Sequence, residues 1–462
     1  MNYPEALDYL YSLINYEIQR PDRYAPEVVS LDRPRALLAA LGNPQRRYPI
    51  IHLTGTKGKG SVSAMCAAAL EAAGLRVGLY SSPHLQDFRE RFRIGNDLIA
   101  PDLIAALVER IRPIVAEIPG LTWFEVVTAL AFTAFAEMRV DAAVIEVGLG
   151  GRLDATNIIE NPVVSVITSL SYDHMHLLGH TIGEIAFEKA GIIKPGVPVV
   201  SAPQPPEGEA VIARIAAERG SPLTLVGREW TYATGAGDEF GQRFTAGPAN
   251  GEQRPYWTPL IGAHQAINGA VATAALSIAA ERLPFAPDPK AAIAAGLSHV
   301  NWPGRLEVVR RAPHLILDAA HNAASAQFLA ESLAGIFLAN RPDSRLTLIF
   351  GAFTDKDVRG MFAALLPHTH RLILMQPISP RAFSTDQLAA LARESGFGGE
   401  ILSRPAAADA LREAESDMET GDVVCATGSL SVVGEMRSVL GLTPGRAAYL
   451  DSVSVRALRG GE

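Results

Sequence analysis

The chain has 462 residues, more than one compact hydrophobic core usually holds, so we expect two or three domains. Hydrophobic residues make up 48% of the chain and charged residues 19%, a composition that excludes disorder as its main description. Acidic residues outnumber basic residues by 49 to 41, and the net charge of -8 argues against general nucleic-acid binding.

The sequence also argues against an exported or membrane-bound protein. Its two cysteines, Cys66 and Cys425, are far apart and belong to no metal-type spacing, which excludes a disulfide scaffold. The N-terminus lacks the basic region of a signal peptide. The longest uncharged run, 260–280, is interrupted by polar side chains that a lipid-spanning helix rarely carries. We therefore expect a cytoplasmic protein with no membrane or nucleic-acid partner.

Short apolar, β-branched segments alternate with longer helical patterns, which predicts a parallel α/β architecture. In the first part of the chain, strands are expected at 50–54, 77–80, 142–147, 163–168 and 197–201. Helices are expected at 61–73, 101–117 and 124–138. The segment 202–259 is rich in glycine and proline and predicts irregular structure with short hairpins.

A second series of strands and helices begins near residue 300, and Pro303 and Gly304 mark the junction. Its strands are expected at 315–318, 346–350, 372–376 and 423–427. Its helices are expected at 324–337, 386–395, 406–415 and 431–440. The sequence therefore predicts two α/β domains, 1–299 and 300–462, with a short frayed tail at 451–462.

The strongest local signal is the segment 55–61, GTKGKGS, between a predicted strand and a predicted helix. Its glycines let backbone amides and the helix N-terminus approach a polyphosphate. Lys59 is placed to reach the β- and γ-phosphates, and Ser61 to lie near a metal ion. A plain glycine turn with solvated lysines is the alternative, but the strand–loop–helix order favours nucleotide binding.

Polar residues at the ends of further predicted strands are candidate Mg²⁺ ligands. Glu146 ends one buried strand, Asp173 and His174 follow the next, and Ser82 follows an earlier one. The carboxyl ends of parallel strands form the ligand-binding edge of a sheet, and hard oxygen ligands there suit Mg²⁺. Taken singly, each residue also fits an ordinary structural role.

Three more charged residues are candidates for the site. Lys189 lies on a short predicted helix, where a surface ion pair with Glu184 or Glu188 is its ordinary interpretation. In the second half, Arg305 is a candidate phosphate clamp and Asp318 ends a predicted strand. A second domain with such loops could close over a nucleotide and carry a second substrate.

Together these segments resemble the folylpolyglutamate synthase/dihydrofolate synthase family of the Mur ligase superfamily. The resemblance covers nearly the whole chain, up to the TGSL segment near residue 430, and its motifs occur in order. They are GTKGKGS at 55–61, YSSPH at 80–84, RER at 89–91, EVGLGGRLDATN at 146–157, DH at 173–174, EKAGI at 188–192, HQAIN at 264–268, PGRLE at 303–307 and DAAHN at 318–322.

The resemblance implies a P-loop Mur-ligase-type central domain with a mainly parallel sheet and a smaller Rossmann-like C-terminal α/β domain. It assigns ATP and folate to 1–299 and glutamate to 300–462. The implied ATP contacts are Thr56, Lys57, Gly58, Lys59, Gly60, Ser61, Asn268, Arg305 and Asp318. The implied Mg²⁺ ligands are Ser82, Glu146 and His174. The implied substrate contacts are Leu121, Thr122, Trp123, Phe124, Leu153, Asp154, Ala155 and His321.

The resemblance also implies that Lys59, Lys189, His174 and Arg305 act in catalysis. Lys189 matches the family's carbamylated lysine, whose added carboxylate helps to hold a second metal ion. Capture of CO₂ needs a neutral amine, which burial favours. K⁺ is a further candidate cation.

The implied reaction is ATP-dependent addition of L-glutamate to the γ-carboxylate of a folate, through an acyl phosphate, by a monomeric enzyme. Two alternatives remain at this point: a Mur-type ligase that uses a UDP-linked acid, and an ATP-binding switch without ligase turnover. The sequence also leaves open whether dihydropteroate is a second acceptor, because 30–33 matches the family's pterin loop only loosely.

Overall fold

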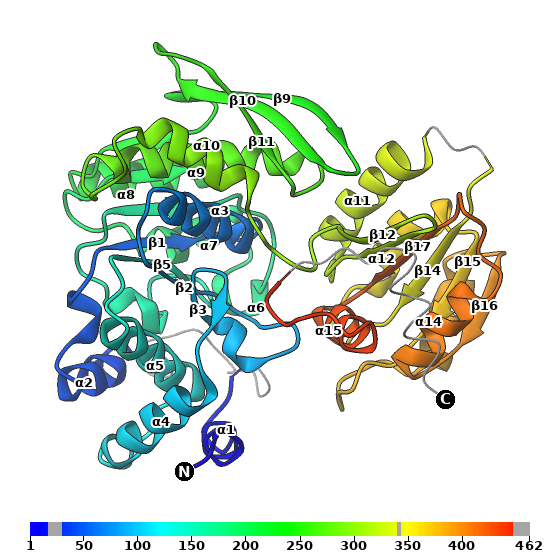
Figure 1. The fold of residues 1–462 in the computed structure, drawn as a ribbon, viewed down its shortest axis with the longest axis horizontal. Coiled ribbons are helices and arrows are strands. Elements are labelled where there is room, and N and C mark those ends of the chain that lie inside the picture. Colours follow the sequence, from blue (N-terminus) through cyan, green and yellow to red (C-terminus); the bar gives the residue numbers. More distant parts are fainter. Residues whose placement is uncertain (17–29, 340–342, 447–462) are drawn as a thin grey trace.

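The structure, a computed structural model, describes residues 1–16, 30–339 and 343–446. The chain forms two α/β lobes that lie side by side, and each lobe is built around its own sheet (Figure 1). The chain passes from the N-terminal lobe to the C-terminal lobe between the helix that ends at Ser298 and the strand that begins at Glu307. The predicted tail at 451–462 lies outside the described residues.

The N-terminal lobe contains an eight-stranded, mainly parallel sheet with the order β4-β3-β2-β5-β1-β6-β7-β8. At its centre, β1 (Ile50–Thr54) pairs in parallel with β5 (Ala142–Glu146) and β6 (Val164–Ile167). The other strands are β2 (Val77–Tyr80), β3 (Phe92–Ile94), β4 (Asp97–Leu98), β7 (Val199–Ser201) and β8 (Leu223–Leu225). All residues of β1 and β5 are buried because helices cover both faces, so these strands read as mainly apolar runs that also hold one or two buried polar residues each.

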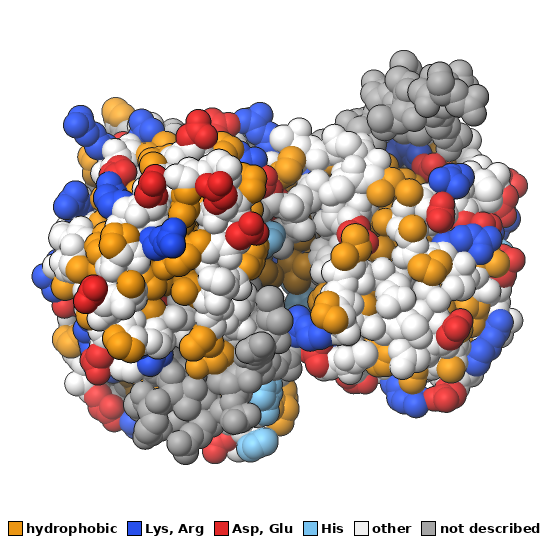
Figure 2. All heavy atoms as spheres, turned by 90° about the horizontal axis from the view of Figure 1, so that it is seen from below, with side chains coloured by type: hydrophobic (Ala, Val, Ile, Leu, Met, Phe, Trp, Pro, Cys, Tyr) orange, Lys and Arg blue, Asp and Glu red, His pale blue; other side chains and the backbone are white. Residues whose placement is uncertain are grey.

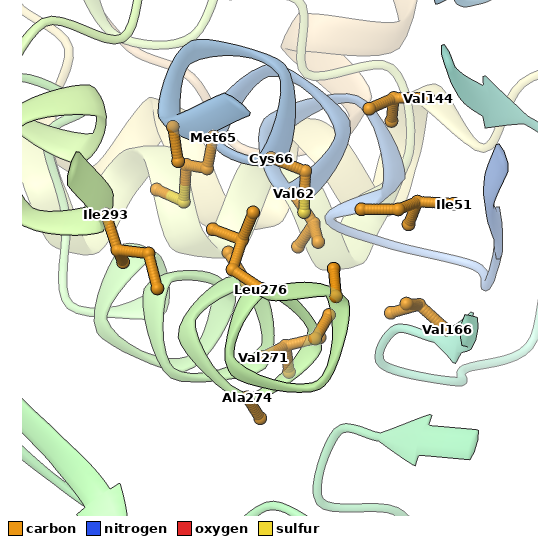
Figure 3. Close-up of a cluster of buried hydrophobic side chains, with 14 of the residues drawn as sticks. Ile51, Val62, Met65, Cys66, Val144, Val166, Val271, Ala274, Leu276 and Ile293 are labelled. Carbon is orange, nitrogen blue, oxygen red and sulfur yellow. The ribbon is translucent and has the colours of Figure 1, made fainter. Parts of the chain in front are cut away.

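Two groups of helices cover the two faces of this sheet. One face packs against α3 (Lys59–Ala72), α9 (His264–Ala280) and α10 (Pro289–Ser298). Figure 3 shows Ile51 and Val166 of the sheet beside Val62 of α3 and Val271 of α9. The other face packs against α1 (Tyr3–Tyr11), α2 (Asp32–Ala40), α4 (Pro101–Ala116) and α5 (Trp123–Glu137).

The segment 202–259 is more regular than its composition predicted. It contains α8 (Pro206–Glu218) and a three-stranded antiparallel sheet of β9 (Trp230–Asp238), β10 (Gly241–Pro248) and β11 (Arg254–Thr258). Most of β9 is exposed, so it lacks the apolar pattern that marks a strand, and pairing with β10 defines it instead. The predicted hairpins are confirmed by β9–β10 and β10–β11, whereas the prediction of irregular structure was wrong for α8.

The C-terminal lobe contains a six-stranded sheet with the order β12-β13-β17-β14-β15-β16. Its strands are β12 (Glu307–Arg311), β13 (His314–Leu317), β14 (Leu346–Phe350), β15 (Arg371–Leu374), β16 (Glu400–Ser403) and β17 (Val423–Thr427). Its helices include α11 (Ala323–Ser332), α12 (Val358–Leu365), α13 (Thr385–Glu394), α14 (Ala407–Glu415) and α15 (Leu430–Val439). The predicted mixed α/β architecture is confirmed, whereas β12, β16 and α12 were not predicted.

Several contacts besides the connecting chain hold the lobes together, among them the His264–Phe328 ring contact and the Arg446–Asp97 ion pair. The loop after β2 packs on α15, where Arg437 donates to Gln86 Oε1 at 2.7 Å. The turn between β9 and β10 reaches the start of β13, where His314 Nε2 and Glu239 Oε2 are 2.8 Å apart. The surface is hollowed where the lobes meet (Figure 2). Among the described residues, no helix has the length and apolar character needed to cross a membrane.

Candidate active site

The segment 55–61 forms a loop between β1 and α3, as its sequence predicted. The backbone amides of Thr56 and Lys57 both donate to Ser169 O at 3.0 Å, which fixes the loop against the chain after β6. The helix α3 begins at Lys59 with Gly58 at its N-cap, and no side chain caps it. The amides of its first turn are therefore left for an anionic ligand.

Two glycines of this loop are required by close packing. Gly58 has φ +87°, and a Cβ there would collide with the Asn268 side chain of α9. A Cβ at Gly60 would lie 2.8 Å from the Trp302 ring, which comes from the segment between the lobes. The predicted ATP contact Asn268 thus lies against the phosphate loop. Trp302 is a neighbour of the loop that sequence reasoning missed.

Two lysines meet at the same carbonyl of the loop. Lys59 Nζ donates to Gly55 O at 3.2 Å, and Lys189 Nζ donates to the same oxygen at 2.9 Å. Lys189 is only 5% exposed, so its interpretation as a surface residue was wrong. Burial, with Lys59 nearby, lowers the pKa of Lys189 to about 7. A large share of this amine is therefore neutral near neutral pH.

Glu146 lies at the end of β5 with an incomplete set of partners. Its Oε2 atom is buried and has no hydrogen-bond partner. Burial raises the pKa of Glu146 to about 7, although Lys59, Arg305 and a backbone hydrogen bond from Ser82 lower it. An orphaned buried carboxylate oxygen near a serine suits a hard divalent cation. Ser82 and Glu146 therefore fit part of a Mg²⁺ site.

His174 and Asp173 lie on the loop after β6 and face the two lysines. A pocket at this edge of the sheet is lined by Lys59, Asp173, His174 and Lys189 among others. Burial lowers the pKa of His174 to about 4, so its imidazole is neutral near pH 7, as a metal ligand must be. Among the described residues, no three His, Cys, Asp or Glu side chains are grouped so that they alone could hold a metal ion. A Mg²⁺ ion here would therefore share its ligands with phosphate oxygens and water.

The C-terminal lobe adds Arg305, Asp318 and His321. Asp318 accepts from Leu306 N at 2.8 Å, which fixes the backbone beside Arg305. Arg305 in turn contributes to the pKa shifts of Glu146 and Asp318, so its charge lies close to both lobes. His321 similarly affects the pKa of Asp173, across the gap between the lobes. The structure thus brings the predicted residues of both halves toward one site.

The comparison with known proteins agrees with these motifs. The Mur ligase middle domain matches residues 53–276, and the Mur ligase glutamate ligase domain matches residues 304–430. The folylpolyglutamate synthase of Lacticaseibacillus casei is 36% identical over 453 residues, which cover 95% of this chain and 99% of the relative. The dihydrofolate synthase/folylpolyglutamate synthase of Bacillus subtilis (strain 168) is 34% identical over 420 residues, with coverage of 89% and 94%.

Solved structures agree as well. Mycobacterium tuberculosis folylpolyglutamate synthase complexed with ADP has a TM-score of 0.83 at 35% identity, covering 96% of this chain and 99% of that one. The chain belongs to the folylpolyglutamate synthase/dihydrofolate synthase family. It is an ATP-dependent ligase that joins glutamate to folate through a carbon–nitrogen bond. Neither the UDP-linked ligase nor the switch without turnover is favoured.

Lys356 is a charged residue of this ligase site that sequence reasoning missed. It comes from the loop after β14 and contributes to the pKa shifts of Lys57, Asp173, His174 and His321. Its only signal was its place in a loop at a strand end. Because its neighbours come from the other lobe or from distant loops, no local spacing could have indicated its role.

The predicted pterin contacts lie mainly in the core. Trp123 is 1% exposed and stacks on Tyr11, with ring centres 6.0 Å apart. The guanidinium carbon of Arg91 lies over the Trp123 ring, 4.7 Å from its centre. Thr122 is the N-cap of α5, and Leu121 is buried. Phe124 is the most accessible of the four and touches the backbone at Gly148. Its ring is therefore the best placed of this group to meet a ligand near the 147–151 loop.

The second predicted group, Leu153, Asp154 and Ala155, is also buried. Both carboxylate oxygens of Asp154 accept hydrogen bonds from neighbouring residues of its own segment, including Leu149 N at 3.0 Å. Asp154 therefore has a structural role in this loop whether or not it also meets a substrate. The roles of these residues in substrate binding stay predictions.

Proposed function

We propose that this ligase activates the folate γ-carboxylate on the N-terminal lobe and receives glutamate from the C-terminal lobe. The observation that carries the proposal is the meeting of Lys59 and Lys189 at Gly55 O, beside a buried carboxylate without a full set of partners. This arrangement concentrates positive charge where a strand, a glycine loop and a helix N-terminus meet. A polyphosphate is the ligand that such a site stabilises best.

In the first step, a γ-carboxylate oxygen of folate attacks the γ-phosphorus of ATP. The bond from that phosphorus to the bridging oxygen breaks, and ADP leaves. Lys59 and the first-turn amides of α3 hold the phosphates, and Arg305 adds charge from the other lobe. Phosphoryl transfer depends mainly on such positioning and charge neutralisation.

In the second step, the amine of L-glutamate attacks the acyl carbon, and inorganic phosphate leaves. The amine loses a proton to the departing phosphate as the amide forms. We assign glutamate binding to His321, whose pKa is lowered to about 4 mainly by burial. In the neutral ring, Nδ1 donates to Ala319 O at 2.9 Å, which leaves Nε2 free to accept from the amine. Exclusion of water by the two lobes protects the acyl phosphate from hydrolysis.

We assign Mg²⁺ to Ser82, Glu146 and His174. When bound, Mg²⁺ neutralises phosphate charge and orients the transferred group. The orphaned Oε2 of Glu146 and the neutral His174 support this assignment. K⁺ as a further cation and the monomeric state stay predictions.

We also propose that Lys189 carries a carbamate in the active enzyme. Its neutral amine attacks CO₂, a nitrogen–carbon bond forms, and one proton passes to solvent. The lowered pKa of about 7 supplies the neutral amine, and the resulting carboxylate adds an anionic ligand beside the phosphate loop. We expect Lys189→Ala to lose most activity and to regain part of it with millimolar acetate. Lys290→Ala, a surface control, should keep its activity, and acetate should not alter that activity. No rescue by acetate, together with an unmodified amine in the bound enzyme, would contradict the carbamate.

The acceptor is tested by ADP release from ATP with tetrahydrofolate or dihydropteroate, each with and without L-glutamate. The structure of Escherichia coli FolC is described as a complex with DHPP and ADP, and it covers 96% of this chain at 30% identity with a TM-score of 0.82. We expect glutamate-dependent ADP release with tetrahydrofolate, and we propose dihydropteroate as a second acceptor. If only dihydropteroate is turned over, the expected activity with tetrahydrofolate is wrong. If only tetrahydrofolate is turned over, the proposal of dihydropteroate as a second acceptor is wrong.

A further inference from the structure

A buried chain of polar side chains runs from the middle of β1 to the 147–151 loop. His52 is fully buried on β1, and its Nε2 lies 2.9 Å from Thr156 Oγ1. Thr156 Oγ1 donates to Asp154 Oδ1 at 2.6 Å, and Thr156 N donates to the same oxygen at 3.0 Å. Asp154 Oδ2 accepts from Leu149 N at 3.0 Å. Three side chains thus connect a core strand to the backbone of the loop.

The direction of these hydrogen bonds determines which ring nitrogen of His52 carries the proton. The one hydroxyl proton of Thr156 is donated to Asp154, so Thr156 Oγ1 must accept from His52. His52 therefore carries its proton on Nε2. Its Nδ1 is buried without a partner, so a second proton there would be an unsatisfied buried donor. Burial accordingly lowers the pKa of His52 to about 3.

The loop at the other end of this chain lines the site. Gly148, Leu149 and Gly150 border the same pocket as Lys59 and Lys189. Thr54, also on β1, donates to Gly150 O at 2.6 Å, so β1 holds the loop at a second point. Glycines have no side chains with which to fix their own position, so these two attachments add to the backbone hydrogen bond from Val147 N to Leu53 O at 2.8 Å in holding the loop.

We propose that His52 is a positioning residue of the ligase, which acts through Thr156 and Asp154 to hold the 147–151 loop against the ATP phosphates. The inference rests on the proposed placement of the phosphates beside Lys59. Loss of the His52 hydrogen bond leaves the Thr156 hydroxyl without its donor and loosens the Asp154 contact to Leu149. The loop then moves away from the phosphates while the strand itself stays in place.

Kinetics of matched variants test the proposal. His52→Phe removes the donor but keeps a ring, Thr156→Val removes the hydroxyl but keeps the shape, and His52→Gln returns an N–H near the position of Nε2. We expect KM for ATP to rise about tenfold in the first two variants, with KM for L-glutamate unchanged. His52→Gln should recover most of this loss. Ile51→Val, a core change on the same strand, should leave KM for ATP unchanged.

Hydrogen exchange gives a readout that does not need ligase activity. The Leu149 amide should exchange more slowly in the wild-type protein than in Thr156→Val, and Ile51→Val should match the wild type. Unchanged exchange at Leu149 and an unchanged KM for ATP in folded Thr156→Val would overturn the proposal, even if His52→Phe does not fold. A wild-type protein that fails to release ADP would instead contradict the proposed function and leave the exchange result to stand by itself.

Discussion

Two charged regions of the molecule are organised in opposite ways. At the N-terminal ends of the C-terminal strands, Arg371 of β15 forms ion pairs with Glu413 at 2.6 Å, Asp417 at 2.7 Å and Glu400 at 2.9 Å. In the N-terminal lobe, Glu146 at the end of β5 and Lys189 on the helix Ile182–Ala190 are both buried and form no ion pair among the described residues.

This difference in ion pairing distinguishes charged residues that stabilise the fold from charged residues that are available to bind a ligand. The acids around Arg371 supply its counter-charge within the protein, and solvent reaches part of that cluster. Glu146 and Lys189 have pKa values shifted toward the neutral forms because burial is not offset by partners. Sites of this kind cost folding energy and are kept where chemistry needs them.

Lys59→Ala is expected to have the largest effect on turnover. Loss of its charge from the phosphate site should lower kcat by about 10³-fold, because its contact strengthens as charge moves in the transition state. Circular dichroism should show an unchanged fold. Lys290→Ala, whose amine pairs with Glu252 on the surface, is the control. Near-normal turnover in folded Lys59→Ala would mean that the site lies elsewhere.

Lys189→Met should separate stability from activity. In the apo protein without CO₂, the folded chain binds fewer protons at Lys189 than the unfolded chain between pH 7 and 10.5. Wild-type stability therefore gains a positive slope with pH in that window, and the cost of the buried amine is greatest below pH 7. The variant lacks this slope and should be more stable by about 1–3 kcal/mol at pH 6, yet about 10²-fold less active. Urea unfolding at pH 6, 7.5 and 9 measures the slope. An equal slope in both proteins would show that Lys189 is not desolvated in solution.

Glu146→Gln should weaken the apparent affinity for Mg²⁺ by about 10–100-fold, with activity partly restored at high Mg²⁺. The amide keeps the shape of the carboxylate but removes its charge. Activity as a function of Mg²⁺ concentration measures the effect, and Asp141→Asn, an exposed residue before the same strand, is the control. An unchanged Mg²⁺ dependence would assign Glu146 to the structural group with Arg371.

Arg371→Met should have the smallest effect on turnover. We expect a loss of about 2–3 kcal/mol in stability, because three acids lose their shared partner. The kinetic constants measured well below the melting temperature should not change. A fall in kcat without a fall in stability would show that Arg371 acts in the reaction rather than in stabilising the fold.

The sequence predicted the central strands because helices cover both faces of the sheet. Strands such as β1 and β14 are then mainly apolar on both faces, and their bounds could be read directly. Hairpins were expected around β9 but its bounds were not, because it is exposed and contains glycines, so its partner strand rather than its own residues defines it. Strand β16 is an edge strand with no fully buried residue, and it was missed for the same reason.

The site was predictable where each residue follows its own strand. Lys59, Glu146 and His174 could be found in this way, since the ends of parallel strands converge whatever the details of the fold. Lys356 and Trp302 could not be found, because their roles depend on how one lobe faces the other. Burial of Lys189 was likewise hidden, since the helix that carries it is amphipathic and its packing against the phosphate loop is a tertiary contact.

The position of β17 has a consequence for how the protein is made. This strand lies between β13 and β14 in the middle of its sheet, although it follows β14, β15 and β16 in sequence. A nascent chain that has emerged only as far as β16 therefore holds two separate sheet fragments with open, apolar edges. The N-terminal lobe has by then all of its strands and can fold first. Chains shortened before Val423 should accordingly accumulate as aggregates, with an intact first lobe attached to an unfinished second one.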